Sequence, residues 1–215
     1  EMRNRIQKQI EQRTAMLAGV SHDLRTPLTR FKLQLAMLKE TPETDELRAD
    51  VREMESMLED YLDFARDHQR ETSETTDLAV LLAEVRGDAQ RKGHDVMIET
   101  HGDLTLPLRR NAFKRLLTNI IDNACKYATN VWVTAVRDGE DIDILVDDDG
   151  QGIPDDQLEE VFRPFYRLDA ARNLDEGGTG LGLAIARDIA RGHGGDVQLA
   201  RSPMGGLRAV IHVPV

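Results

Sequence analysis

The sequence predicts an α+β protein, in which a helical hairpin is followed by an α/β two-layer sandwich. Three observations favour this fold class. Up to Ala65 the apolar residues follow only helical spacing, the polar stretch from Arg66 to Thr76 has no apolar period, and helical and strand-like segments are mixed beyond it. We therefore expect a first domain at residues 1–70, a mobile linker at 71–76 and a second domain at 77–215.

The first domain shows one narrow apolar seam repeated in two segments. From Ile6 to Leu38 the apolar residues recur in steps that are mostly three or four, and the spacing resumes from Leu47 to Ala65 after the break at Thr41-Pro42-Glu43-Thr44. The pattern predicts an antiparallel hairpin of two helices. Because a single hairpin buries only one side of each seam, we expect a homodimer that closes a four-helix bundle. A monomeric hairpin packed on the rest of the chain is the alternative.

The second domain is expected to contain helices on one face of a mainly antiparallel sheet. Its elements are predicted as a helix capped by Asp77, a strand near Asp95–His101, a helix from about Asn111 to Tyr127, strands VWVTAVR and DIDILVD joined at Asp138-Gly139, a helix from about Gly180 to Arg191, and a hairpin around Met204-Gly205-Gly206.

The composition excludes several classes of protein. A net charge of -11 and the absence of clustered Lys and Arg argue against a nucleic-acid partner. A single cysteine, Cys125, cannot form an internal disulfide, which fits a reducing compartment. No apolar run is long enough to span a membrane, and no signal peptide is visible. The chain starts without Met, inside a polar helical pattern, so we expect it to be part of a longer protein.

Two glycine-containing motifs in the second domain are candidates for ligand binding. The stretch Asp147–Pro154 ends a strand with carboxylates and two glycines, although a simple turn collects the same residues. The stretch Gly177–Gly182 opens a helix, where unhindered amides can face phosphate oxygens. It lacks the GK[ST] of a Walker loop and the βαβ context of a dinucleotide site.

A third candidate lies on the long helix. Asn119 and Asn123 are four residues apart and point the same way, followed by Lys126 and Tyr127. Neutral oxygen ligands suit Mg²⁺, which also keeps water and phosphate in its shell. The alternative is an amphipathic helix with two polar residues on its wet face.

Taken in order, four segments resemble a known family. NIIDNACKYA, DDDGQGIP, VFRPFYRLD and GGTGLGLAIA resemble the N, G1, F and G2 boxes of the GHKL (Bergerat) ATP-binding fold, and the resemblance spans Asp77 to Val215. It implies ATP and Mg²⁺ as ligands, with Asn123 on the metal and Asn119 beside it. Lys126 would contact phosphate.

The same resemblance implies the remaining contacts of the nucleotide. Asp149 would accept the adenine amino hydrogen, Gly152 would leave room for the base and Tyr127 would wall the pocket. The triphosphate would be lined by a glycine-rich turn that contains Gly178, Thr179, Gly180, Leu181 and Gly182. The segment from Leu168 to Glu176 would form a short lid, with Arg163 and Arg167 near its hinge.

His22 is a candidate nucleophile in the first domain. It lies about 200° of helical rotation from the seam residues Val20 and Leu24, which turns the imidazole to solvent. Asp23 is its neighbour, and Thr26 lies one turn further on the same face. An exposed imidazole can attack the γ-phosphoryl group of ATP while an adjacent carboxylate takes its proton. Pro27 should bend the helix beside it.

The stretch SHDLRTPLTR resembles the H-box of sensor histidine kinases, and AGVSHDLRTPLTR is especially similar to the EnvZ type of osmosensor kinase. The resemblance implies that His22 is the phosphoacceptor and Asp23 the acid/base residue. Thr26 would position the water that dephosphorylates the partner. The implied partner is the receiver domain of a response regulator, which takes the phosphoryl group on an aspartate.

The resemblance also implies a HAMP linker and a membrane sensor before this chain, which would be the cytoplasmic portion of an inner-membrane protein. The other histidines are interpreted as solvated side chains. Two rival functions are an ATP-driven clamp, in which the hairpin only dimerises, and a pseudokinase scaffold. The scaffold is disfavoured because every box keeps its chemically necessary residue.

Overall fold

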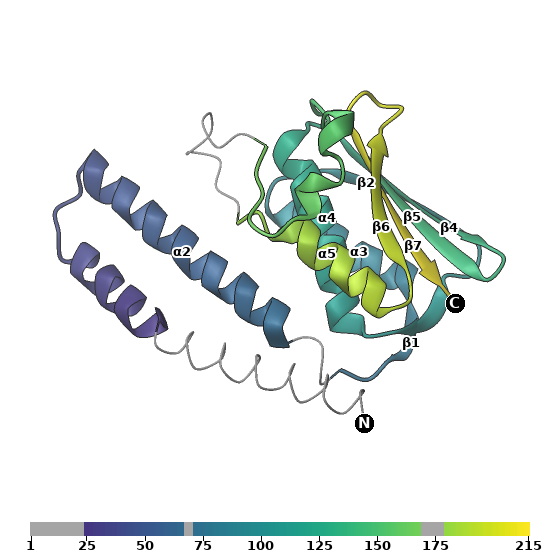
Figure 1. Cartoon of the computed structure of the whole chain (residues 1–215), viewed down its shortest axis with the longest axis horizontal. Helices are drawn as coiled ribbons and strands as arrows, with labels where there is room; N and C mark the ends of the chain where they lie inside the picture. Colours follow the sequence, from purple (N-terminus) through teal and green to yellow (C-terminus); the bar gives the residue numbers. More distant parts are fainter. Residues whose placement is uncertain (1–23, 67–70, 169–178) are drawn as a thin grey trace. The chain divides into compact units, whose positions relative to one another are not determined.

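The computed structural model describes residues 24–66, 71–168 and 179–215. The chain divides into two compact units (Figure 1). The first unit contains the helices at residues 24–66, and the second contains residues 71–168 and 180–215. Each unit is described by itself.

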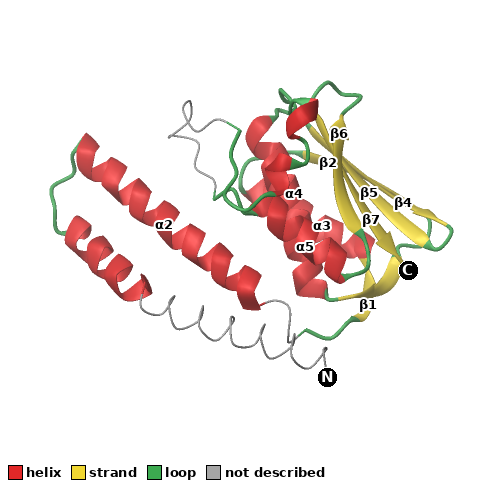
Figure 2. Cartoon of the chain, viewed as in Figure 1, coloured by secondary structure: helices red, strands yellow, loops and turns green. Residues whose placement is uncertain are grey.

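The first unit is a helical hairpin. A helix over residues 24–36 is followed by α2 (Pro42–Arg66), both drawn in red in Figure 2. Thr41 caps α2, because its hydroxyl accepts from the Thr44 N–H at 3.3 Å while the Thr41 N–H donates to the Thr44 hydroxyl at 2.8 Å. Pro42 fits the first position, where its missing N–H is not needed. A break between the two helices is present as expected, but it spans residues 37–41 and not 41–44, because Pro42, Glu43 and Thr44 already belong to α2. The helix expected before residue 24 lies outside the described residues.

The hairpin buries few of its apolar side chains. Leu28 and Val51 are buried. Other large apolar residues among the described ones are exposed, namely Leu24, Phe31, Leu33, Met37, Leu38, Leu47 and Met54. A single copy of the hairpin therefore leaves most of these apolar side chains in contact with water.

The second unit is built on a five-stranded sheet. Its spatial order is β2 (Val96–His101), β4 (Val131–Asp138), β5 (Asp141–Asp148), β7 (Leu207–Pro214) and β6 (Asp196–Arg201). β2 pairs with β4 in parallel, and the other neighbours are antiparallel. The predicted strands and the final hairpin are confirmed.

Three helices cover one face of this sheet (Figure 1): α3 (Leu78–Arg91), α4 (Arg110–Tyr127) and α5 (Gly182–Gly192). Alternate residues of each central strand point toward them and are buried, such as Ile142, Ile144 and Val146 of β5. As expected, Asp77 caps α3, since its carboxylate accepts from the Ala79 N–H at 2.9 Å. The second unit is therefore the predicted two-layer sandwich.

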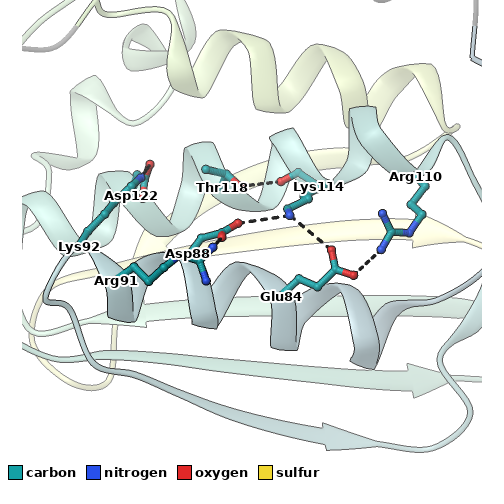
Figure 3. Close-up of polar contacts among 8 residues, drawn as sticks. All are labelled: Glu84, Asp88, Arg91, Lys92, Arg110, Lys114, Thr118 and Asp122. Atoms are coloured by element: carbon teal, nitrogen blue, oxygen red, sulfur yellow. Dashed lines mark hydrogen bonds and ion pairs between the residues drawn. The ribbon is translucent and has the colours of Figure 1, made fainter.

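A network of charged side chains joins α3 to α4 on their outer side (Figure 3). Glu84 pairs with Arg110, and Lys114 donates to Glu84 at 3.3 Å and lies 3.2 Å from Asp88. These side chains are about one-third exposed, so each pair contributes little on its own. The network links α3 to α4, the helix on which the two candidate asparagines lie.

A second, two-stranded sheet was not anticipated. β1 (Glu74–Asp77) pairs antiparallel with β3 (Thr105–Leu108), and Thr76 is buried. Residues 74–76 were expected to be part of a mobile linker, but they form most of β1 and belong to the second unit. A strand of four residues is too short for its apolar alternation to be recognised in the sequence, and its partner strand lies far away along the chain.

Candidate functional site

A pocket lies where α4, α5 and three strands of the large sheet meet. Two polar side chains point into it, Asn123 of α4 and Asp148 of β5. Its other lining residues are apolar: Ile120, Ala124, Val146, Leu183, Leu199, Leu207 and Ala209. The cavity is small, about 10 Å³, which is room for about one water molecule, and its lining combines apolar side chains with two polar ones.

Asp148 is placed in the pocket by the alternation of its strand. It follows Val146 by two residues, so both lie on the helix-covered face of β5. Its carboxylate oxygen Oδ1 accepts from the Gly150 N–H at 2.9 Å and from the Leu207 N–H at 3.0 Å. A side chain at Gly206 would overlap this oxygen, which explains the glycine there. Asp148 is thus buried and held in one orientation.

Asp149, the residue predicted to bind adenine, is engaged elsewhere. Its Oδ1 accepts from the N–H groups of Thr129 and Asn130, both at 2.9 Å, and its Oδ2 accepts from the Asn130 side-chain amide at 2.7 Å. The Asn130 backbone bond, followed by the Asn130 side chain, lowers the pKa of Asp149 below its usual value. Asp149 therefore caps the turn after α4 and does not line the pocket.

The sequence contained a signal for Asp148. Counted back from Gly150 and Gly152, the D-x-G-x-G spacing begins at Asp148 and not at Asp149. Gly152 has φ +68, and a Cβ added there would lie 3.4 Å from the Gly206 carbonyl oxygen. The two glycine turns thus approach each other beside the pocket.

The remaining predicted residues of α4, Asn119, Lys126 and Tyr127, are not among the residues that line the pocket. Asn119 has a buried side-chain nitrogen, Nδ2, with no hydrogen-bond partner. The Cβ that Gly182 lacks would lie 3.9 Å from the side chain of Asn119, so this glycine turn faces the helix. Lys126 holds its ammonium 4.9 Å from the ring centroid of Tyr127, which is exposed at the end of α4.

The glycine-rich turn before α5 is tightly packed. Gly180 has φ +67, and an added Cβ would lie 2.9 Å from the carbonyl carbon of Phe165. The Phe165 N–H donates to the Gly180 carbonyl at 3.0 Å. Leu181 is buried and Thr179 is half-buried. Gly178 lies outside the described residues.

Arg163 and Arg167 lie on the loop that precedes this turn. Both are exposed, and Arg163 pairs with Glu160. Of the expected lid, only Leu168 is described, and residues 169–176 lie outside the described part.

The predicted catalytic residues of the hairpin are only partly within the described chain. His22 and Asp23 lie outside it. Thr26 is exposed in the helix over residues 24–36, and so is Pro27. The bend expected beside His22 likewise falls outside the described residues. The structure therefore shows the surroundings of Thr26 alone.

The second unit fits Mg²⁺ bound together with a phosphate ligand. Amide oxygens from Asn119 and Asn123 are suitable hard ligands for the metal. The unpaired Asn119 Nδ2 is a donor, so it fits a phosphate oxygen and not the metal ion. Within residues 24–66, 71–168 and 179–215, no group of three or more His, Cys, Asp or Glu could hold a metal alone. Among these same residues no helix is long and apolar enough to cross a bilayer.

Comparison with family models gives a match for each unit. Residues 109–215 match the model described as histidine kinase-, DNA gyrase B- and HSP90-like ATPase. Residues 12–70 match the His Kinase A (phospho-acceptor) domain. The two predicted resemblances are confirmed.

Curated relatives resemble the whole chain. The sensor histidine kinase CpxA of Escherichia coli is 36% identical over 227 residues, which cover 100% of this chain and 50% of CpxA. GtrS of Pseudomonas aeruginosa, also a sensor histidine kinase, is 34% identical, with 99% of this chain and 44% of GtrS covered. The chain thus spans about half the length of the curated relatives it matches.

Solved structures resemble the fold as well. Full-length ShkA in complex with AMPPNP matches with a TM-score of 0.73 and 27% identity over 93% of this chain and 45% of ShkA. The ATP-binding domain of PrrB from Mycobacterium tuberculosis matches 67% of this chain with a TM-score of 0.57 and 29% identity. That alignment covers 98% of the PrrB domain.

Proposed function

Because this chain belongs to the sensor histidine kinases, we propose that it transfers the γ-phosphoryl group of ATP to His22. The observation that supports the ATP site best is the pocket in which Asn123 and Asp148 converge beside the glycine-rich start of α5. A helix N-terminus preceded by glycines offers amides to phosphate oxygens. The apolar lining around Asp148 suits the base.

We further propose that Asp148 accepts the adenine amino hydrogen, the role first expected of Asp149. Asp148 lines the pocket, and its two hydrogen bonds from backbone N–H groups both fall on Oδ1. Gly152, in the turn that follows, has no side chain to occupy the space proposed for the base. Tyr127, exposed at the end of α4, would form one wall of the adenine site. The neighbouring Asp149 stabilises the turn that brings these residues together.

The phosphates are proposed to lie between α4 and the start of α5. Asn123 would ligate Mg²⁺ with Asn119 beside it, and Lys126 would contact a phosphate oxygen. Bound there, the metal ion would neutralise charge on the β- and γ-phosphates. Gly178, Thr179, Gly180, Leu181 and Gly182 would surround the triphosphate, and Arg163 and Arg167 would approach it from the preceding loop.

In the proposed reaction, a ring nitrogen of His22 forms a bond to the γ-phosphorus as the bond to the bridging oxygen of ADP breaks. Asp23 takes the ring proton. The resulting P–N bond keeps most of its transfer potential, so the phosphoryl group can pass to an aspartate of a response regulator. Thr26, exposed on its helix, would position the water for the reverse, phosphatase role.

We propose that the chain works as a homodimer. The exposed apolar side chains of the hairpin, such as Phe31 and Leu47, would be covered by the same hairpin of a second copy in a four-helix bundle. The whole protein is proposed to be anchored through a HAMP and transmembrane sensor region, with this part in the cytoplasm at the inner membrane.

The decisive test is labelling with [γ-³²P]ATP and Mg²⁺. We expect acid-labile, base-stable label in the unmodified protein and none in His22→Ala, with ATP binding kept in both. His101→Ala changes an exposed histidine of the second unit and serves as the matched control. Undiminished label in His22→Ala, or steady ATP hydrolysis without phosphohistidine, would contradict the proposal.

A further inference from the structure

Arg187 occupies a junction in the second unit, although its own atoms do not line the pocket. Its side chain is 13% exposed, which is low for an arginine. Nε donates to Asp196 at 2.9 Å, and Nη1 donates to Glu159 at 2.5 Å. The face of the guanidinium lies 4.3 Å from the ring centroid of Phe162. Arg187 thus joins α5 to β6 on one side and to the loop of residues 154–166 on the other.

At the start of β6, Asp196 accepts hydrogen bonds from a second arginine as well. Arg191 donates to Asp196 at 3.0 Å, and the Val197 N–H donates at 2.9 Å. Burial disfavours the ionised form of Asp196, but the bonds from Arg187, Arg191 and Val197 outweigh it and lower its pKa to about 2. The carboxylate is therefore charged at any physiological pH.

On the side of the loop, residues 154–166 are tied to one another. The Gln157 N–H donates to the Pro154 carbonyl at 2.9 Å, and the Arg163 N–H donates to the Glu160 carbonyl at 2.9 Å. The Tyr166 hydroxyl donates to the Gln157 side chain at 3.1 Å, which closes the loop. The Tyr166–Gln157 bond therefore links the end of this loop to its first turn.

This loop meets the α5 segment at a second point. Phe165 donates its N–H to the carbonyl of Gly180 at 3.0 Å, and Phe165 itself has φ 66, a strained value for a residue with a side chain. Gly180 precedes α5, which begins at Gly182, and Arg187 lies within that helix. The loop of residues 154–166 is thus held by Arg187 and by Gly180. If the contacts with Arg187 are lost, the loop can rotate about the remaining contact at Gly180.

We propose that Arg187 is a positioning residue for nucleotide binding. By holding Glu159 and Phe162, it keeps Phe165 in its strained conformation against Gly180, and so fixes the backbone of Gly180 before α5, where the phosphates are proposed to lie. The inference rests on the proposed ATP site and adds to it a residue outside the pocket.

Arg191 supplies a matched control, since it binds the same carboxylate one helical turn later. The contacts of Arg191 with Asp196 can therefore be removed without touching the anchor at Glu159 and Phe162. If Arg187 has a purely structural role, Arg187→Met and Arg191→Met should change the Kd for AMPPNP equally when they lower the melting temperature equally. A positioning role predicts that they differ.

The test uses the full chain and calorimetric titration with AMPPNP and Mg²⁺. We expect Arg187→Met to raise the Kd about tenfold and Arg191→Met to stay within about twofold of the unmodified protein. Hydrogen exchange at the Phe165 amide should accelerate in Arg187→Met but not in Arg191→Met. Phe162→Leu removes the ring beneath the guanidinium and keeps an apolar side chain there, so we expect both effects in this variant too. It serves as the loop-side variant if Arg187→Met does not fold.

The comparison is between Arg191→Met and a folded loop-side variant, which is Arg187→Met or Phe162→Leu. If the two have the same Kd and the same exchange rate at the Phe165 amide, the positioning role is wrong. This result is distinct from failure of the proposed function. If the unmodified chain does not bind AMPPNP, the ATP site is wrong, whereas normal binding that is insensitive to Arg187 and Phe162 defeats only the inference.

Discussion

The backbone N–H of Arg109 donates a hydrogen bond of 3.1 Å to Nε2 of His193, 84 residues away. The other ring nitrogen, Nδ1, lies 2.8 Å from the Ile189 carbonyl oxygen and must donate to it. The imidazole is therefore neutral, with its proton on Nδ1. The ring also meets Phe113 edge-on, with centroids 5.5 Å apart. The end of α5 and the beginning of α4 are joined through this one side chain.

We predict that His193→Ala destabilises the second unit by about 1–3 kcal/mol, because the half-buried N–H of Arg109 loses its acceptor. Urea unfolding measures the change. His94→Ala serves as control, since His94 is exposed. Equal stability of the two variants would show that the Arg109 contact contributes nothing.

Glu71 caps the same helix from another direction. Its carboxylate accepts from the N–H groups of Asn111 at 2.7 Å and Ala112 at 3.0 Å, whereas the N-cap residue Arg109 makes no side-chain cap. We predict that Glu71→Ala costs about 1 kcal/mol of unfolding free energy and accelerates exchange at these two amides.

The control for Glu71 is Glu74→Ala, which removes an exposed carboxylate three residues later. It should change the unfolding free energy by less than about 0.5 kcal/mol. Faster exchange at Asn111 and Ala112 in this control as well would argue against a specific cap.

The two neighbouring aspartates can be separated by Asn substitutions. Asp148→Asn keeps an oxygen for the Gly150 and Leu207 N–H groups but replaces the other oxygen with a donor, so we predict at least about tenfold weaker AMPPNP binding. Asp149→Asn should alter the 129–130 turn and leave binding within about threefold. Calorimetric titration of both variants decides, and the reverse ranking would restore Asp149 as the adenine ligand.

The ion pairs of Asp196 with Arg187 and Arg191 should make part of the unfolding free energy sensitive to acid. The folded pKa of Asp196 is about 2, below its ordinary value of 3.8, so the folded state binds fewer protons than the unfolded chain between these values. Its contribution is complete above the unfolded pKa and is lost as pH falls toward 2. After allowance for solvent screening we expect about 1–2 kcal/mol.

Urea unfolding at several pH values, with Asp196→Asn beside the unmodified protein, measures this contribution. The difference in unfolding free energy between the two should be constant above about pH 5 and should shrink toward pH 2. A difference that does not vary with pH would contradict the assigned pKa.

Local signals in the sequence predicted most of the fold. Asp77 lies directly before an apolar helical period, and the alternation in DIDILVD predicts which residues of β5 face the helices. The same alternation carried to the end of the strand distinguishes Asp148 from Asp149, since it aligns Asp148 with Val146. The expectation for Asp149 used the motif without this geometry.

Long-range contacts were beyond such signals. Glu71 and His193 cap α4 from 40 and 84 residues away, and no periodicity encodes such a pairing. His193 was interpreted as a solvated side chain, yet it is half-buried and hydrogen-bonded. His212 is exposed as expected, although its Nδ1 lies 2.8 Å from Asp143. Arg187 likewise has partners, Glu159 and Asp196, that lie on separate segments.

The β1–β3 ladder and the Glu71 cap determine where a fragment of this protein should begin if it is to keep the second unit intact. A fragment that starts at Asp77, where the sequence places the second domain, would lose three of the four β1 residues and leave two amides of α4 without acceptors. A fragment that starts at Glu71 keeps both. Expression trials of the isolated nucleotide-binding part should therefore begin six residues earlier than the apolar pattern suggests.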